Sequence, residues 1–381
     1  SLAAVKRLVR RAGTGTSKVE EHIATLHDVA KLAAVSPSTV SRILKVKEGE
    51  PIPFSSETQT RVRHAATRLG YRPSKLARGL VGSRTGIVGL VVPSLEDSFF
   101  PGITAALQAT LNASGYNLLL VDAKHDSSIE SRSIDDFLAW RVDGLVIAPS
   151  QSTVDAALFW ELWRLRVPFV LIDRTFADTP FFSVTTDDRT GAMQATEHLI
   201  GLGRTRIACV GSALPVSTAR VRHAGYAEAL LRGGLAVDPR YDLQAEPTIS
   251  AGAVLLERLL ALRPMPDALF CFSDMVAIGV VEACLERGVR IPDDLAVIGY
   301  ADLEMSRFSK IRLTTVRQPR NAIGETAARM LLRRIAREEV EPAQAVLPVE
   351  LIVRESTGMP AAPTSRKTKR KATKHDRDQH G

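Results

Sequence analysis

The apolar positions of this chain follow two different patterns. Over the first 85 residues they recur every three or four positions, which is typical of amphipathic helices around a small core. From Thr85 onward, short apolar runs alternate with longer helical patterns, which predicts parallel strands joined by helices that cover both faces of a sheet. The patterns together predict an all-α N-terminal domain followed by a larger α/β region.

Segment 25–45, TLHDVAKLAAVSPSTVSRILK, contains two short helical patterns with separate start signals. Thr25 can cap the first helix, and Ser36 can cap the second. Pro37 then stands at the first helical position, where a missing N–H costs no hydrogen bond. Two alanines at the join allow the helix axes to cross closely and steeply. This arrangement predicts a helix-turn-helix.

A third helix is predicted over Ser56–Leu69, between a capping Ser55 and a terminating Gly70. The polar face of the second helix carries short side chains and one arginine, namely Ser38, Thr39, Ser41 and Arg42. Such a face can enter a major groove, where hydroxyls reach phosphates or base edges and arginine can bind guanine through two hydrogen bonds. Without further information, a solvated helix on a small helical domain is the alternative.

The α/β region is predicted to hold strands at Ile87–Val92, Tyr116–Val121, Gly144–Ala148, Pro168–Ile172, Ile207–Val210, Ala268–Phe272 and Ala296–Gly299, with early helices near Gly102–Asn112 and Ile129–Trp140. These strands are enough for two doubly wound sheets. Such sheets bind ligands beyond the carboxyl ends of their strands. Two facing lobes would therefore place those ends around one cleft.

Charge is distributed unevenly along the 381 residues, whose formal net charge is +8. Residues 1–85 hold sixteen Lys and Arg against six Asp and Glu, and residues 359–381 hold seven against two, whereas the centre is acidic. Basic ends indicate a polyanion partner. Residues 1–24 are predicted to be a flexible basic arm and residues 359–381 a disordered basic tail. An alternative interpretation of the tail, as well supported as binding to a polyanion, is that it only increases solubility.

Several classes of protein are disfavoured by what the sequence contains. Three widely spaced cysteines in apolar runs indicate buried free thiols in a reducing compartment. No apolar run approaches the length of a membrane span, and the first residues do not form a signal peptide, so a cytoplasmic location is expected. No glycine-rich nucleotide motif follows a strand, and the histidines have no metal spacing. The chain is therefore expected to be no enzyme and to need no cofactor or metal.

Two segments resemble the DNA-binding part of the lactose-repressor/galactose-repressor (LacI/GalR) family. These are TLHDVAKLAAVSPSTVSR in the helix-turn-helix and LGYRPSKLARGL, residues 69–80. In that family, paired hinge helices enter the minor groove and wedge a leucine into a base step. The resemblance gives that role to Leu80, which would otherwise be an ordinary linker residue. The DNA contacts it implies are Thr25, Ser36, Pro37, Ser38, Thr39, Ser41, Arg42, Ala77, Arg78 and Leu80.

The headpiece also departs from the family pattern. The segment GEPIPF indicates an insertion of about four residues in the loop before the third helix, a place where loops tolerate changes of length. Lys45 stands where many members have Asn, and Ala34 replaces a common Gly. The operator sequence therefore cannot be copied from a relative.

The α/β region resembles the periplasmic-binding-protein-like core of the same family through segments such as RVDGLVIAPS, VPFVLIDR and LTTVRQP. By position, the resemblance implies effector contacts from Phe99, Phe100, Asp173, Arg222, Ser273, Asp274 and Gln318. A carboxylate, an amide, a planar arginine and an aromatic face suit a polyol. Two of these residues have structural alternatives: Asp274 as a helix cap, and Asp173 as the ion-pair partner of Arg174.

Two positions leave the chemical class of the effector open. Many relatives have two consecutive Asp residues where this chain has Ala301 and Asp302, and Ser273 stands where Asn is frequent. A sugar or related metabolite is expected, and a nucleoside or an acid held by Arg222 stays open.

The resemblance implies a homodimeric transcription regulator, expected to be a repressor, that binds a pseudo-palindromic double-stranded operator and responds to a small-molecule effector. The expected domains are residues 25–72 for DNA binding, 73–84 for the hinge and 85–358 for the effector-binding and dimerisation core. Whether the effector is an inducer or a corepressor is not encoded in these patterns. The alternatives are a sugar-binding transport protein, which would lack the headpiece, and an enzyme on a doubly wound fold.

Overall fold

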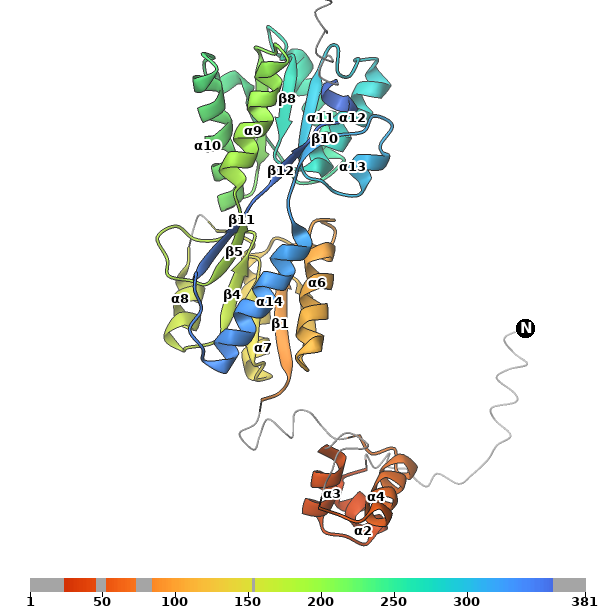
Figure 1. Ribbon diagram of the computed structural model, residues 1–381. Coiled ribbons are helices and arrows are strands. Elements are labelled where there is room, and N and C mark those ends of the chain that lie inside the picture. Colours follow the sequence, from red (N-terminus) through yellow and green to blue (C-terminus); the bar gives the residue numbers. More distant parts are fainter. Residues whose placement is uncertain (1–23, 46–52, 73–83, 153–154, 359–381) are drawn as a thin grey trace, which may run out of the picture. The chain divides into compact units, whose positions relative to one another are not determined.

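The computed structural model describes residues 24–45, 53–72, 84–152 and 155–358, and the chain divides into two compact units, Ser1–Thr85 and Gly86–Gly381 (Figure 1). Residues 1–23 of the expected arm, residues 73–83 of the expected hinge and the whole expected tail lie outside this part of the chain. Among the described helices, none combines the length and the apolar character that a membrane crossing needs.

The first unit contains the three predicted helices, which are α2 (Leu26–Ala33), α3 (Pro37–Lys45) and α4 (Ser56–Arg68). Thr25 and Asp28 form a reciprocal capping box at the start of α2. The Ser36 hydroxyl accepts a hydrogen bond from the backbone N–H of Thr39, 3.2 Å away. Ser55 caps α4, which ends one residue before the predicted Leu69. The start signals therefore act as the sequence predicts.

A small apolar core joins the three helices. Its fully buried members are Val29, Ala33, Val40, Ile43 and Val62, and Ala30, Ala65 and Ala66 complete it. The side chain of Arg61 on α4 donates a hydrogen bond of 3.1 Å to the carbonyl of Ala33, so α4 is also tied to the turn of the helix-turn-helix. The recognition face of α3 is thereby held on a rigid support.

Ala34 ends α2 in the left-handed conformation, with φ at 52°. This conformation strains an L-residue by about 1–2 kcal/mol, whereas glycine adopts it freely but loses more entropy on folding. Because Ala34 is exposed and packs little, Ala34→Gly is expected to stabilise the first unit by roughly 1 kcal/mol. Amide hydrogen exchange of the headpiece in the full chain measures this.

Glycine at His64, an exposed position inside α4, is the matched control for Ala34→Gly. There the backbone is right-handed, so the same residue type is expected to destabilise the unit by about 0.4 kcal/mol. Equal effects of both substitutions would contradict the strain at Ala34.

The second unit consists of two α/β lobes (Figure 1). The sheet of the first lobe is parallel and has the order β11-β5-β4-β3-β1-β2. Its strands are β1 (Ile87–Val92), β2 (Asn117–Asp122), β3 (Gly144–Ile147), β4 (Phe169–Ile172), β5 (Ser183–Thr186) and β11 (Gln344–Leu347). Helices α6 (Phe100–Ala113) and α14 (Arg320–Ala336) cover one face, and α7 (Ser127–Ala139) and α8 (Ala157–Arg164) cover the other.

The second lobe repeats this design with the strand order β12-β10-β9-β8-β6-β7. Its strands are β6 (Ile207–Ser212), β7 (Asp242–Ala245), β8 (Ala268–Cys271), β9 (Ala296–Ala301), β10 (Thr314–Arg317) and the antiparallel edge strand β12 (Glu350–Ile352). Helices α9 (Asp188–Gly201) and α10 (Ser217–Arg232) cover one face, and α11 (Ala251–Ala261) and α12 (Asp274–Arg287) cover the other. Three short helices complete the lobe: α13 (Met305–Phe308), η1 (Pro239–Tyr241) and η2 (Glu355–Thr357).

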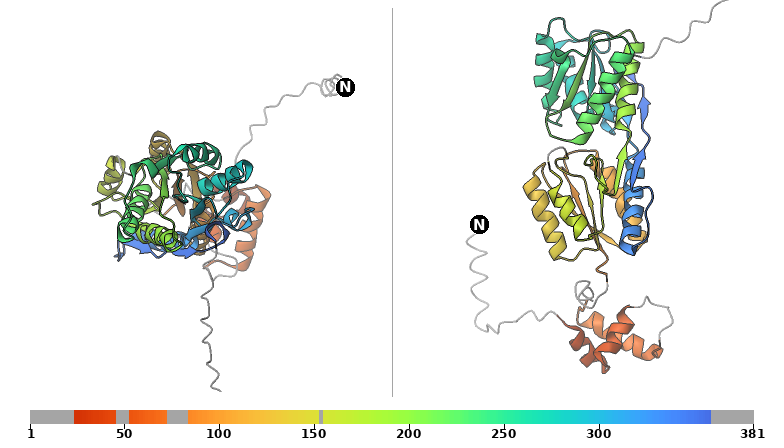
Figure 2. Two further views of the ribbon diagram at one scale, coloured as in Figure 1. Left: turned by 90° about the horizontal axis from the view of Figure 1, so that it is seen from above. Right: turned by 90° about the vertical axis from the view of Figure 1, so that its left-hand side faces the viewer.

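The two lobes are connected by neighbouring segments. The described chain passes between them from β5 to α9, from β10 to α14 and from β11 to β12 (Figures 1 and 2). Each crossing is short, so it allows the lobes to change their angle without unfolding either sheet. The carboxyl ends of the parallel strands in both lobes meet around the space beside these crossings.

The predicted fold class is confirmed, and the seven predicted strands are present with small shifts at their ends. The sequence did not identify β5, β7, β10, β11 or β12. Their sequences, such as SVTT and DLQA, are short and partly polar. The strands β7, β11 and β12 lie at sheet edges and are partly exposed, so the apolar run that marks a central strand is absent. The strands β5 and β10 are buried, but their threonines interrupt the apolar run.

Candidate ligand cleft and DNA-binding helix

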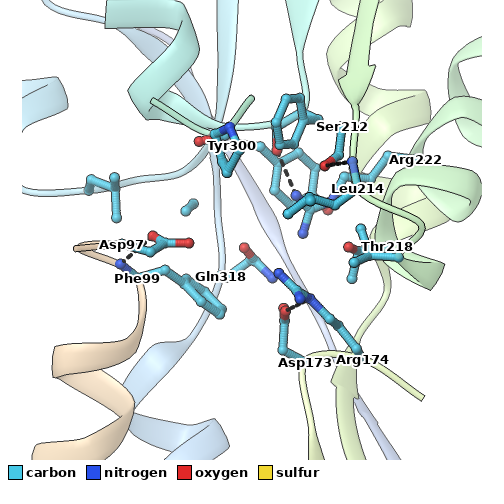
Figure 3. A pocket seen from close by; sticks show the side chains of 16 residues that line it. Asp97, Phe99, Asp173, Arg174, Ser212, Leu214, Thr218, Arg222, Tyr300 and Gln318 are labelled. Carbon is cyan, nitrogen blue, oxygen red and sulfur yellow. Dashed lines mark hydrogen bonds and ion pairs between the residues drawn. The ribbon is translucent and has the colours of Figure 1, made fainter. Parts of the chain in front are cut away.

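A pocket lies between the lobes of the second unit, with an empty volume of about 530 Å³ that includes its open mouth. Its lining residues come from strand ends in both lobes: Asp97 and Phe99 after β1, Asp173 and Arg174 after β4, Ser212, Leu214 and Val216 at and after β6, Phe272 and Ser273 after β8, Tyr300, Ala301 and Leu303 at β9, and Gln318 after β10. Thr218 and Arg222 of α10 and Pro247 complete the lining. Figure 3 shows side chains of both lobes pointing into the same space.

Arg222 on α10 is one of two buried arginines in the pocket lining, with Arg174, and is only 8% exposed. Its guanidinium donates one hydrogen bond of 2.6 Å to the Phe272 carbonyl and one of 3.2 Å to the Asp188 carboxylate. Its carbon Cζ lies 3.8 Å from the centre of the Tyr300 ring. The Nε atom has no hydrogen-bond partner among the described residues. The side chain is therefore held rigidly in the pocket wall, where its guanidinium has more N–H donors than these two hydrogen bonds use.

Asp173 follows β4 in the left-handed conformation, with φ at 63°, and its carboxylate is buried in the pocket wall. The Nε atom of Arg174 lies 3.4 Å from this carboxylate, and Arg174 also donates to the carbonyl of Pro149 at 3.0 Å. Burial raises the pKa of Asp173 to about 6, although Arg174 and Arg222 act in the opposite direction. Asp173 therefore pairs with Arg174 and also lines the pocket.

The shifted pKa of Asp173 predicts a pH-dependent stability. The value of about 6 in the folded protein exceeds the ordinary 3.8, so ionisation of the carboxyl disfavours the folded state. This penalty is absent well below pH 4 and nearly complete at pH 7. The free energy of unfolding of the wild type, relative to Asp173→Asn, is therefore expected to fall by about 2 kcal/mol between pH 4 and pH 7.

Chemical denaturation followed by tryptophan fluorescence measures this difference, because all three tryptophans, Trp140, Trp160 and Trp163, belong to the same lobe as Asp173. A difference between the two proteins that stays constant across this pH range would contradict a raised pKa.

The structure places two of the expected effector residues outside the pocket. Phe100 is 1% exposed and belongs to the apolar core of the first lobe, against the edge of Phe99. Asp274 is fully buried, and its carboxylate accepts hydrogen bonds from the Leu303 N–H, the Ser306 hydroxyl and the Thr315 hydroxyl at 2.6–2.7 Å. Asp274 therefore joins the start of α12 to β10 and to the segment after β9, and its full burial keeps it away from the pocket.

The cap of α12 is Ser273 and not Asp274. The Ser273 hydroxyl accepts a hydrogen bond from the N–H of Met275 at 3.2 Å, and the same residue lines the pocket. The capping role that the sequence offers as an alternative for Asp274 thus belongs to its neighbour.

Asp302 cannot serve as a ligand-binding carboxylate in this arrangement. It is buried beneath three arginines: Arg307 lies at 3.0 Å, Arg317 at 2.8 Å, and Arg354 also contacts it. Burial acts to raise its pKa, but the hydrogen bonds from these arginines outweigh that effect and lower the pKa to about 2. Its neighbour Ala301 faces the pocket instead. This side of the pocket is therefore apolar, with Tyr300 and Leu303.

Direct hydrogen bonds join the lobes on both sides of the pocket. On one side, the Ser217 N–H donates to the Ser152 hydroxyl at 2.7 Å, and the Thr175 N–H donates to the Ser217 hydroxyl at 3.3 Å. On the other, Gln318 donates to the Thr186 hydroxyl at 2.9 Å, beside the lobe crossings. A ligand that contacts both walls can therefore alter how the lobes close on each other.

Several lining residues were not predicted from the sequence, notably Asp97, Ser212, Thr218 and Tyr300. Asp97 and Ser212 follow or end predicted strands, and this position could have identified them as candidate lining residues. The contribution of Tyr300 could not be predicted, because its ring reaches Arg222 only through the packing of β9 against α10.

The DNA-binding candidates on α3 lie together at the start and along one face of the helix. The Ser36 hydroxyl lies 2.8 Å from that of Ser38 and 2.9 Å from that of Thr39. Pro37 opens the helix, and Ser41 and Arg42 follow on its accessible side. Thr25 stands at the N-cap of α2. Ala77, Arg78 and Leu80 lie outside the described residues.

Comparison with known protein families agrees with both parts of the chain. A model of bacterial regulatory proteins of the lacI family matches residues 25–74, and a model of the periplasmic binding protein-like domain matches residues 196–357. The HTH-type transcriptional repressor CytR of Escherichia coli (strain K12) is 32% identical over 341 residues, covering 90% of this chain and 98% of that protein. The ribose operon repressor of the same organism is 31% identical, covering 84% and 95%.

Solved structures show the same relationship. The lac repressor dimer bound to operator and the anti-inducer ONPF has a TM-score of 0.78 at 28% identity, covering 88% of this chain and 99% of that chain. The complex of the transcriptional regulator CelR with cellobiose has a TM-score of 0.66 at 31% identity, covering 87% and 99%. The chain therefore belongs to the lacI family of bacterial regulatory proteins.

Family membership confirms the expectation of a DNA-binding transcription regulator controlled by a small-molecule effector, and decides against an enzyme or a transport protein. The expected binding to operator DNA, the expected homodimer and the expected cytoplasmic location are consistent with membership of this family.

Proposed function

We propose that this protein is a repressor that binds a pseudo-palindromic operator as a homodimer and changes its grip when a small polar metabolite enters the cleft between the lobes. One observation carries the effector side of this proposal: hydrogen-bonding side chains of both lobes converge at strand ends on one pocket beside the lobe crossings. A ligand there gains different contacts in open and closed forms, which is the condition for shifting an equilibrium between them.

On the DNA side, the proposal assigns residues 25–72 to the operator-binding domain. Arg42 binds a base edge in the major groove, while Thr25, Ser36, Ser38, Thr39 and Ser41 bind phosphates or neighbouring bases and Pro37 shapes the start of the helix. From the family resemblance, segment 73–84 is the hinge, with Ala77 and Arg78 beside Leu80 in the minor groove. The remaining segment, 85–358, binds effector and forms the dimer.

On the effector side, Asp173, Arg222, Ser273 and Gln318 provide hydrogen bonds and Phe99 provides an aromatic edge. Phe100 and Asp274 support the pocket from behind. The relatives include a ribose operon repressor, and one similar structure holds cellobiose. A sugar or a related metabolite with several hydroxyls, such as a nucleoside, fits a wall that has both charged donors and an apolar side.

A thermal-shift screen of sugars, sugar acids and nucleosides against the full chain tests this proposal, followed by operator binding with each stabilising compound. The expected result is one chemical class that raises the melting temperature, since a ligand of the folded state stabilises it, and that changes operator affinity. The proposal fails if the protein prefers no defined duplex over random DNA with any of these compounds present.

A further inference from the structure

Arg42, the only arginine on α3, has an unusual neighbour. Its side chain is exposed, and it forms no hydrogen bond or ion pair with other described residues. Its guanidinium carbon lies 5.9 Å from the centre of the Phe54 ring. Twelve positions separate the two residues in sequence, so this contact depends on the fold of the headpiece.

We infer that Phe54 is a positioning residue that pre-orients Arg42 for base recognition and thereby sharpens operator specificity. This inference rests on the proposed role of Arg42 in binding a base edge. It concerns a residue that lies outside the helix-turn-helix, immediately before the cap of α4.

Phe54 is well placed to be the fixed partner of the pair. It is half-buried and packs against the apolar core of the headpiece. Its carbonyl accepts a hydrogen bond of 2.9 Å from the side-chain amide of Gln59, one turn into α4. Ser55, the next residue, caps the same helix. The ring is thus anchored by α4, and the long side chain of Arg42 is the partner that adjusts.

The geometry suits recognition because of how a guanidinium uses its surroundings. An aromatic face attracts the cation through the ring quadrupole, while the N–H donors point outward in the plane of the guanidinium. A cation held over a ring therefore keeps its hydrogen-bonding edge free for the two acceptors of guanine. It also loses less side-chain freedom when it binds, which is the advantage of pre-organisation.

An ordinary core role for Phe54 would have a different consequence. Loss of packing weakens the headpiece and so weakens binding to every duplex alike. Loss of the stacking partner acts only through Arg42, so it weakens binding to duplexes that carry the base recognised by this arginine. Sequence dependence of the loss separates the two roles.

The experiment uses the full-length protein and an operator selected from a random duplex library. Competition binding with Arg42→Ala first identifies the base pair at which discrimination disappears. Phe54→Leu keeps an apolar side chain of similar size but removes the ring. It is expected to reduce affinity for the selected operator by about five- to thirtyfold, because an exposed cation–π contact is lost in each of the two half-sites. Phe54→Tyr keeps the ring face and is expected to restore wild-type affinity.

Two further measurements complete the test. Phe54→Leu is expected to leave binding unchanged when the base pair assigned to Arg42 is substituted, and to add no further loss in the Arg42→Ala background. An equal loss on all duplexes, or a full loss in the Arg42→Ala background, would overturn the inference and leave Phe54 as a core residue. If the wild type selects no duplex, the proposed function itself fails; if it selects one and Phe54→Leu binds it normally, only this inference fails.

Discussion

Arg222→Lys is expected to weaken binding of the effector by about 100-fold, while operator binding without effector stays within about twofold of the wild type. Lysine keeps a positive charge beside Asp188 but cannot form the planar fork that bonds the Phe272 carbonyl and lies on Tyr300. Each hydrogen bond of a charged group contributes about 1.5–3 kcal/mol, so the loss of one or two such bonds to ligand accounts for this factor.

Lysine is a better test than alanine at this position. Arg222→Ala would leave the buried Asp188 carboxylate without its cation, which costs roughly 3–5 kcal/mol and endangers the fold of the second lobe. The matched control is Arg189→Ala, which removes an exposed arginine that pairs with Glu228 on the neighbouring helix. Calorimetric titration of the ligand found by screening measures the effect. A normal response of Arg222→Lys would exclude this pocket as the effector site.

Arg42→Ala is expected to lower affinity for the specific operator by at least about 30-fold and to leave effector binding unchanged. A bidentate arginine–guanine contact discriminates by about 1–3 kcal/mol, and a homodimer on a pseudo-palindrome makes the contact in both half-sites. Affinity for random duplex is expected to fall only slightly, because phosphate contacts that do not depend on sequence remain.

The control for Arg42→Ala is Arg287→Ala, which removes the same charge from an exposed pair with Glu257 on the second unit. Fluorescence anisotropy with specific and random duplexes at one salt concentration separates specificity from general attraction. Equal losses of operator affinity and effector affinity in Arg42→Ala would mean that the two units do not divide these tasks.

Local signals along the chain were sufficient for the class of fold. Helix caps such as Thr25 and Ser55 act within three residues, and central strands such as Ile87–Val92 are apolar because both faces are covered. The carboxyl ends of these central strands mark where a ligand pocket lies in this fold. The family resemblance assigned Asp173, Ser273 and Gln318 to such strand ends, and all three line the pocket.

Tertiary structure alone decided what each polar side chain near those strand ends does. Ser273 and Asp274 are neighbours, yet Ser273 lines the pocket, whereas the buried Asp274 carboxylate accepts hydrogen bonds from three residues far along the chain. The Asp302 carboxylate forms ion pairs with arginines that lie up to 52 positions away in the sequence. The contact between Arg42 and Phe54 likewise forms only once α3 and α4 share a core. Backbone conformation depends on near neighbours, whereas the partners of a buried charge are set by which distant segments the fold brings within 3 Å.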